Sequence, residues 1–309
     1  MSFIDLKSLQ IAWNRFFHGA TATWSSGLFR ISLGLVLLVN LTVFSVDAQM
    51  WYSDAGTLSY FESRLIVDTN TVTLFGWFEN TPGKVRAYFC VFFLAILLFT
   101  IGFYARVQAV ILFVLLTSLQ HRNHLMLEGE DVLMRLLTFY SIFLPLDHNF
   151  SVRSWWRQRN QIAPYPQQTS AWPLRLVQFQ MTLIYVSSDI IKLHGTPWID
   201  GTAMYYVARL DDVFTGRLLP ATLLNSLPFL KFLTWSVLLF EILLPLGLWV
   251  KQTRKWFLFA AVLFHLAIDV NMNLFLFHWA MMVGLIAFLQ RDDVPESLRR
   301  FLPEAKPDN

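Results

Sequence analysis

Residues 27–46 read GLFRISLGLVLLVNLTVFSV, and the only charged side chain in this stretch is Arg30. An α-helix needs about 20 mainly apolar residues to cross the hydrocarbon of a bilayer. The stretch is long enough for one crossing, and its apolar character leaves it little reason to contact water. The sequence therefore predicts a transmembrane helix here.

Further apolar runs follow along the chain, at residues 86–104, 174–193, 228–250 and 256–290. The last of them is long enough for two crossings. Two shorter apolar pieces, 109–119 and 132–146, are separated by the polar stretch 120–131. We expect them to form a helical hairpin whose turn is buried in protein or faces water, because lipid-exposed irregular backbone leaves peptide groups without partners. The sequence thus predicts an all-α, polytopic integral membrane protein with about eight transmembrane helices, including this short hairpin.

The composition agrees with a lipid environment. Of the 309 residues, 55% are hydrophobic and 15% are charged, against roughly 45–50% and about 25% in an ordinary soluble domain. The net charge of +3 is too small to indicate a nucleic-acid partner. Cys90 is the single cysteine, so the chain forms no internal disulfide and offers no redox pair.

The distribution of Lys and Arg predicts the orientation. With eight spans and a cytoplasmic N-terminus, the basic clusters around 153–159, 251–255 and 291–306 all fall inside, where such residues are enriched. We therefore expect both termini in the cytoplasm, with the protein in the bacterial inner membrane. The first apolar run begins late and is followed by no small-residue cleavage pattern, so it is expected to remain as a span. The predicted organisation is an N-terminal interfacial segment (1–26), a transmembrane domain (27–290) and a cytoplasmic tail (291–309).

Ionisable side chains within the apolar runs are the first candidates for function. Each costs roughly 2.5–3.5 kcal/mol at the centre of a membrane helix for Arg, Lys or Asp, so those present usually face the protein interior. They are Arg30, Asp131, Arg135, Asp189, Lys192, Glu241, His265, Asp269 and His278. For Arg30, Arg135 and Glu241 we favour structural pairing of these ionisable groups with one another over a functional role. Arg30 sits near the end of its span, so its side chain can instead extend to the membrane interface.

Lys192 stands out because it ends an apolar helix. The residues that follow, LHGTPWIDG at 193–201, contain the Gly and Pro that stop a helix. Burial disfavours the ammonium form, so a lysine held there can lose its proton near neutral pH and act as a base. Asp189 lies three residues earlier on the same helical face and would stabilise the charge. The alternative is a structural salt bridge from Lys192 to Asp189 or Asp131.

Two further groups are candidates. Asn123 and His124 lie at the polar apex of the predicted hairpin, and His265 with Asp269 has the spacing that places both on one helix face. In the eight-span topology the apex, Lys192 and Asp269 all fall toward the outer side, so they can share an outward-facing pocket. The alternative for each histidine is a hydrogen-bonded core residue.

Metal and nucleotide chemistry are not indicated. His265 and Asp269 supply only two ligands and no HExxH-like motif is present, so no metal site is predicted. The chain also contains no phosphate-binding loop, nucleotide fingerprint or serine nucleophile motif.

The order of several short motifs resembles that of a known family. They are Arg122-Asn123-His124, Asp131, Phe143-Leu144-Pro145-Leu146, Ser151, Lys192-Leu193, Trp198, Gly201 and His265. This pattern is similar to that of the HTTM family, the horizontally transferred transmembrane proteins, whose domain is shared with vitamin K-dependent gamma-carboxylase. The resemblance covers residues 20–290.

The resemblance implies a chemistry. In the carboxylase a lysine followed by leucine, ahead of a Trp and a Gly, deprotonates reduced vitamin K, and the quinol then reacts with oxygen to give a base that removes a glutamate γ-hydrogen before carbon dioxide adds. Lys192 matches that lysine, so the resemblance implies catalytic roles for Lys192, His124 and His265 and cofactor contacts from Asn123 and Trp198. The cofactor implied is reduced vitamin K or another quinol. The segment from Lys192 to Trp198 is one residue longer than in the animal enzymes, and their large soluble domain is missing here.

Two functions follow. The first is a carboxylase-like membrane enzyme with Lys192 as base. The second is a non-enzymatic membrane partner in the processing, export or immunity of a secreted peptide. In both, the expected partners are membrane lipid and a secreted peptide or protein. Transport is less favoured, because the charged residues form no paired pattern between the halves of the chain.

Overall fold

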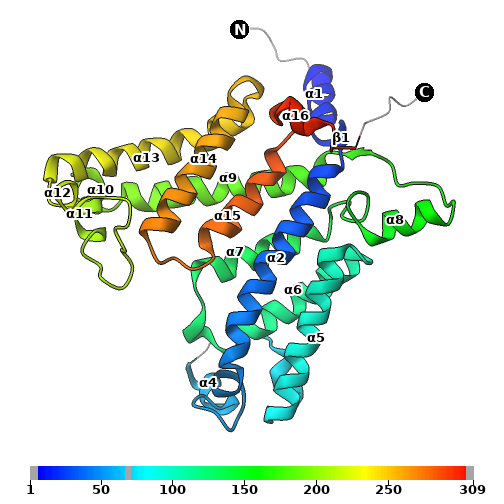
Figure 1. The fold of residues 1–309 in the computed structure, drawn as a ribbon, viewed down its shortest axis with the longest axis horizontal. Coiled ribbons are helices and arrows are strands. Elements are labelled where there is room, and N and C mark those ends of the chain that lie inside the picture. Colours follow the sequence, from blue (N-terminus) through cyan, green and yellow to red (C-terminus); the bar gives the residue numbers. More distant parts are fainter. Residues whose placement is uncertain (1–5, 67–70, 304–309) are drawn as a thin grey trace. The chain divides into compact units, whose positions relative to one another are not determined.

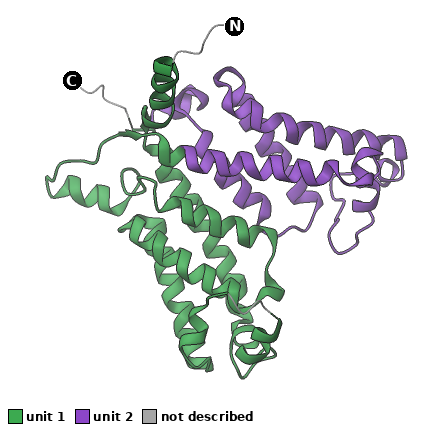
Figure 2. Cartoon of the chain, turned by 180° about the vertical axis from the view of Figure 1, so that it is seen from behind, with its two compact units in different colours: residues 1–174, 302–309 green, residues 175–301 purple. Residues whose placement is uncertain are grey.

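The computed structural model describes residues 6–66 and 71–303, and this part of the chain is mostly helical (Figure 1). The predicted interfacial segment and tail extend to residues 1–5 and 304–309, which lie outside the described residues. The chain forms two compact units, residues 1–174 with 302–309 and residues 175–301 (Figure 2).

Unit 1 contains the first half of the chain and the residues up to 174, together with residues 302–309. Its elements are α1 (Leu6–His18), β1 (Ala20–Ala22), α2 (Trp24–Val46), α3 (Ala48–Tyr52), α4 (Tyr60–Ile66), η1 (Leu74–Trp77), α5 (Pro82–Ile101), α6 (Ala105–Arg122), η2 (His124–Met126), α7 (Gly129–Ser141), α8 (Val152–Arg159) and β2 (Gln168–Ser170). Helix α2 packs against α5 and α7, and α6 packs against α5 and α7. These four helices form the core of the unit.

Unit 2 begins within α9 (Trp172–Leu193). Its other elements are α10 (Thr196–Ile199), α11 (Ala203–Val207), α12 (Ala221–Leu224), α13 (Leu227–Trp249), α14 (Lys251–Asn271), α15 (Phe277–Leu285), η3 (Ile286–Phe288), η4 (Arg291–Asp293) and α16 (Glu296–Arg299). Helix α14 packs between α13 and α15, and α11 packs on α13. Helix α9 joins this group through side chains: Gln178 donates to the carbonyl of Ala287 (2.7 Å), and Trp249 donates to the Thr182 hydroxyl (3.0 Å).

Three helices of the described residues, α2, α5 and α13, are long and apolar enough to cross a membrane. Each coincides with a predicted apolar run, and the long run 256–290 divides into α14 and α15 as expected. Helices α6, α7, α9, α14 and α15 also lie on predicted runs but do not combine the same length and apolar character. A helical membrane protein is therefore supported, and the number of eight crossings stays a prediction.

Two features depart from the expected helical pattern. Strands β1 and β2 form a small antiparallel sheet with Thr21 opposite Thr169, which the all-α prediction did not include. Pairing between such distant segments leaves no local pattern in the sequence. The hairpin α6–α7 does form, but α7 ends at Ser141 rather than continuing to Leu146. Pro145 fits this early end, because it has no N–H to donate to the carbonyl of Ser141 four residues earlier and its ring would clash with that carbonyl in a continued helix.

A buried arginine organises the core of unit 1. Arg30 of α2 is fully buried and donates hydrogen bonds to the backbone carbonyls of Thr100, Leu146, Asn149 and Phe150. It therefore ties α2 to the end of α5 and to the loop after α7. This role is structural, but its partners are backbone carbonyls rather than the ionisable side chains expected. Just beyond α5, Gly102 adopts a left-handed conformation (φ 75°), where a side chain would collide with the Arg30 guanidinium.

Candidate functional site

One group of buried polar residues in unit 2 lies around one face of α9. Tyr185, Asp189 and Lys192 lie at positions i, i+4 and i+7, which places them on a single side of the helix. The opposing groups come from α13, α14 and α15, which contribute Glu241 and two histidines. Side chains from four helices therefore form one polar cluster in unit 2.

Lys192 forms an ion pair with Glu241 of α13. The two side chains are 18% and 13% exposed, so the pair is largely withdrawn from solvent. The ammonium group also lies over the ring of Trp198, 5.1 Å from its centroid, which is within the range of a cation–π contact. The partner of Lys192 is thus Glu241, a residue expected only as a structural tie, rather than Asp189 or Asp131.

Asp189 is 5% exposed, and its Oδ1 has no hydrogen-bond partner among residues 6–66 and 71–303. A buried carboxylate oxygen without a donor is costly, because burial removes the water that would otherwise solvate it. This oxygen therefore marks a place where a donor from a ligand or a water molecule would be stabilised.

A chain of hydrogen bonds links α9 to α14 and α15. The Tyr185 hydroxyl contacts His265 Nε2 (2.8 Å), and His265 Nδ1 contacts His278 Nδ1 (3.0 Å). All three residues are at most 3% exposed. His278 Nε2, at the end of this chain, is buried and has no hydrogen-bond partner in the described part of the protein.

The relay can exist in two neutral forms. A hydrogen bond between two Nδ1 atoms needs one donor and one acceptor, so exactly one of the two imidazoles carries its proton there. If His265 donates, His278 Nε2 carries a proton; if His278 donates, His278 Nε2 is an acceptor and His265 Nε2 donates to Tyr185. Movement of protons along Tyr185, His265 and His278 would therefore switch the terminal nitrogen between donor and acceptor, which is the property of a proton shuttle.

His265 and Asp269 both lie on α14 at the spacing that places them on one face, as expected. The two ring nitrogens of His265 contact Tyr185 and His278. Within the described residues no group of three or more His, Cys, Asp or Glu side chains is arranged to hold a metal ion. The chemistry that this cluster supports is proton transfer.

Asn123 and His124 belong to unit 1, whereas Lys192, Trp198 and His265 belong to unit 2. Asn123 directly follows the last residue of α6. It caps η2, because its Oδ1 accepts a hydrogen bond from the backbone N–H of Leu125 (3.1 Å). The His124 ring stacks on His121, with centroids 5.7 Å apart. Burial, together with the nearby positive charge of Arg135, lowers the pKa of His124, which favours the neutral imidazole.

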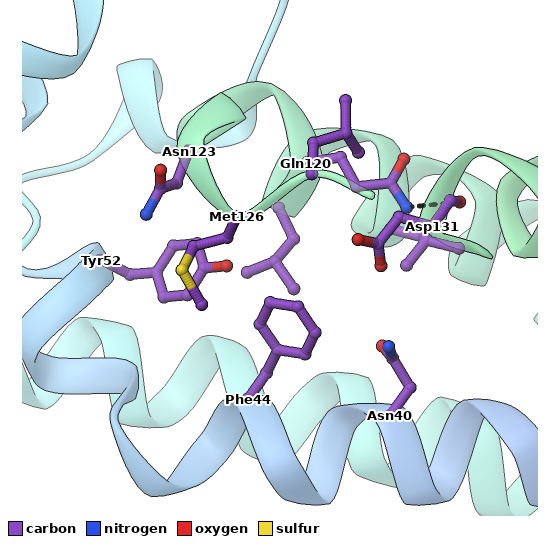
Figure 3. Close-up of a pocket in the computed structure, with 10 residues that line it drawn as sticks. Asn40, Phe44, Tyr52, Gln120, Asn123, Met126 and Asp131 are labelled. Carbon is purple, nitrogen blue, oxygen red and sulfur yellow. Dashed lines mark hydrogen bonds between the residues drawn. The ribbon is translucent and has the colours of Figure 1, made fainter. Parts of the chain in front are cut away.

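Asn123 also lines a small cavity in unit 1 (Figure 3). Three polar atoms at this cavity, Asn40 Nδ2, Gln120 Oε1 and Asn123 Nδ2, lack hydrogen-bond partners from any described residue. The Gln120 amide nitrogen is occupied, because it donates to the carbonyl of Asp131 (2.8 Å). The volume of about 10 Å³ corresponds to one water molecule. The cavity as it stands therefore does not fit a quinone ring.

Some residues of the Lys192 cluster and of the small cavity can be recognised in the sequence as polar residues within apolar runs, and others cannot. His278 and Glu241 are recognisable as ionisable residues in apolar runs, and Asn40 is likewise a polar residue in the middle of one. Tyr185 is not, since tyrosine is common in membrane helices. Its one signal is its position one turn before Asp189 on the face that also carries Lys192.

Comparison with known proteins gives the family. The model of the HTTM domain matches residues 18–292. The chain is 27% identical over 225 residues to an uncharacterized Bacillus subtilis protein, YitO, covering 71% of each chain. It is 25% identical over 268 residues to the sporulation-delaying protein SdpB of Bacillus subtilis, covering 85% of this chain and 80% of that one. No solved structure matches the chain. Because the domain model spans nearly its whole length, the protein belongs to the HTTM domain family.

Proposed function

We propose that the protein is a carboxylase-like membrane enzyme in which Lys192 accepts a proton from the hydroxyl group of a quinol-type cofactor. The observation that carries this proposal is the largely buried Lys192–Glu241 pair beside a relay that ends in a buried nitrogen with no described partner. Ionisable groups placed at such expense inside an apolar bundle are typical of functional sites.

The residues of unit 2 fit a cofactor that presents hydroxyl and carbonyl oxygens. Lys192 and His278 Nε2 are suited to these oxygens, and the indole of Trp198 offers an apolar face beside the Lys192 ammonium. Reduced vitamin K or a related quinol would supply the reducing equivalents and the ionisable hydroxyl when bound. The resemblance to the carboxylase also assigns a catalytic role to His124 and a cofactor contact to Asn123; both residues belong to unit 1, and these two roles stay predictions.

Glu241 forms a direct, largely buried ion pair with Lys192 and is therefore placed to take up the proton that Lys192 must release before it acts as a base. When the proton resides on Glu241, the Lys192 amine has a free lone pair and takes a proton from a hydroxyl group at Nζ. Tyr185, His265 and His278 then provide a route by which a proton leaves or enters the cluster.

The test is replacement of Lys192 in protein reconstituted with reduced vitamin K, a glutamate-containing peptide and labelled carbon dioxide. Arginine keeps the positive charge but, with a pKa above about 12, does not release its proton. Lys192→Arg and Lys192→Ala should therefore both abolish incorporation of the label. The matched control is Lys84→Arg, since Lys84 forms an exposed pair with Glu79. Full activity in Lys192→Arg would show that Lys192 is a structural cation.

A second function is favoured by one observation, the similarity over most of both chains to a protein named for delaying sporulation. In this case the protein acts as a non-enzymatic partner in the processing, export or immunity of a secreted peptide. The two proposals differ in what Lys192 does: a non-enzymatic partner that folds normally would keep its cellular effect in Lys192→Arg, whereas an enzyme would lose it. Extraction of the purified protein with organic solvent would reveal a bound quinone only in the first case.

A further inference from the structure

A second cavity of unit 1 has the features of an anion site. It has a volume of about 230 Å³ and lies between the start of α6, the loop after α7 and α8. Its polar lining consists of Tyr104, Arg106, Asp147, His148, Arg153 and Tyr165. None of these residues belongs to the cluster around Lys192, so this cavity is independent of the proposed function.

Arg153 is held rigidly at this cavity. Its guanidinium stacks on the ring of Tyr104, 3.6 Å from the centroid, and its Nε donates to the Tyr165 hydroxyl (2.6 Å). The Tyr165 ring is fixed in turn by His148, which stacks on it at 4.8 Å with nearly parallel planes. Arg153 Nη1 is buried without a hydrogen-bond acceptor among the described residues. The guanidinium is therefore positioned in advance but lacks a full set of acceptors.

The charge of the cavity is positive. Neither Arg106 nor Arg153 forms an ion pair within the described part of the chain. Arg106 donates hydrogen bonds to the backbone carbonyls of Leu144 and Phe143. Asp147 is the one carboxylate in the lining, and its Oδ1 accepts a hydrogen bond from the backbone N–H of Ala105 (3.0 Å). Two guanidinium groups thus face a single carboxylate that already has a partner.

The cavity lies at the end of a helix that is long and apolar enough to cross the membrane. Helix α5 ends at Ile101, and the turn to α6 includes Tyr104 in a left-handed conformation (φ 50°). The cavity is therefore expected at the level of the lipid headgroups. The neighbouring α8 exposes Trp155 and Trp156 by 56% and 51%, and Trp and Tyr are enriched at this level of a bilayer. Basic pockets at such positions bind anionic headgroups.

We propose that this cavity binds a phosphate group, that of an anionic phospholipid, with Arg106 and Arg153 donating hydrogen bonds to the phosphate oxygens. The planar guanidinium suits phosphate because it presents paired donors in a fixed geometry. A lipid headgroup and free phosphate present the same phosphate oxygens to the two arginines. Inorganic phosphate is therefore needed as a second probe to tell these two ligands apart.

The experiment measures lipid binding to the full-length protein by native mass spectrometry. Phosphatidylglycerol, zwitterionic phosphatidylcholine and inorganic phosphate are titrated separately. We expect one phosphatidylglycerol to remain bound to the wild type in preference to phosphatidylcholine. In the double variant Arg106→Gln/Arg153→Gln this affinity should fall by about tenfold or more, because each lost charge-assisted hydrogen bond is worth on the order of a tenfold change.

Two further variants make the result decisive. Arg159→Gln removes an arginine that stacks on Trp155 outside the cavity and should leave binding unchanged. Arg106→Lys/Arg153→Lys retains both charges and should recover part of the affinity, which separates loss of the site from loss of the fold. Competition by inorganic phosphate alone would identify free phosphate as the source. Equal binding of both lipids, or an unchanged affinity in the double glutamine variant, would overturn the proposal.

Discussion

Lys192 and Glu241 show how much one buried partner matters at the scale of single residues. The pair is nearly closed off from solvent, so removing one charge leaves the other desolvated and uncompensated. A surface pair of the same chemistry, Lys84 with Glu79, is 50% and 81% exposed and is well hydrated in either case. The same ionic contact therefore has different energetic consequences in the two places.

The prediction at this scale concerns Glu241→Gln. We expect it to lower the free energy of unfolding by roughly 2–4 kcal/mol, because Lys192 loses its direct ion-pair partner and keeps a largely buried positive charge. Thermal or detergent-induced unfolding of the purified protein measures this. Glu79→Gln is the matched control and should change stability by about 0.5 kcal/mol or less. Adding Lys192→Met to Glu241→Gln should recover part of the loss, and equal stability of Glu241→Gln and wild type would contradict the buried pair.

Among the elements, the start of α7 carries the clearest electrostatic feature. Glu128 and Asp131 form a capping box, in which Asp131 Oδ2 accepts from the backbone N–H of Glu128 (3.0 Å). Glu130 lies between them and is 5% exposed. Burial, with the neighbouring carboxylates, raises the pKa of Glu130 to about 7. Carboxylates near a helix N-terminus are usually stabilised by its dipole, but at Glu130 desolvation outweighs this effect.

This raised pKa predicts a pH dependence of stability. The folded state holds the Glu130 proton more tightly than the unfolded chain, whose pKa is about 4.5. The contribution is therefore complete below pH 4.5 and is lost as the pH rises toward and through 7. We expect the thermal midpoint to fall between pH 5 and 8. Glu130→Gln, which stays neutral, should flatten that part of the profile, and an unchanged slope in this variant would assign the dependence to another group.

For the whole molecule, the prediction is that both termini face the cytoplasm. The basic residues are concentrated in segments that share one side in the eight-span topology, and positive charge is retained on the cytoplasmic side. Residue 158 of α8 should then lie inside, and residue 79 before α5 should lie outside.

Cysteine labelling in intact cells tests this topology. In a Cys90→Ala background, which removes the single native cysteine, Glu79→Cys should react with a membrane-impermeant maleimide and Gln158→Cys should not. Both should react after the cells are opened, which controls for accessibility of the thiol. Labelling of Gln158→Cys in intact cells would reverse the orientation.

The helices of this protein follow largely from the sequence. The free energy of transferring a segment into lipid is the sum of the contributions of its own side chains, so it needs no knowledge of distant contacts. Each predicted apolar run contains most of at least one helix, and the position of Lys192 at a helix end follows from the Gly and Pro after it. The limits of α7 and the pairing of β1 with β2 were missed, the first through the effect of Pro145 and the second through a contact between distant segments.

The partners within the candidate site come from tertiary packing. Nothing in the sequence around Lys192 indicates Glu241, which lies on another helix and reaches it because α13 faces α9 in unit 2. The relay of Tyr185, His265 and His278 depends in the same way on three helices meeting. A sequence determines which residues are costly to bury, since that cost belongs to each side chain, whereas the pairing that offsets the cost depends on distances that exist only after the helices have packed.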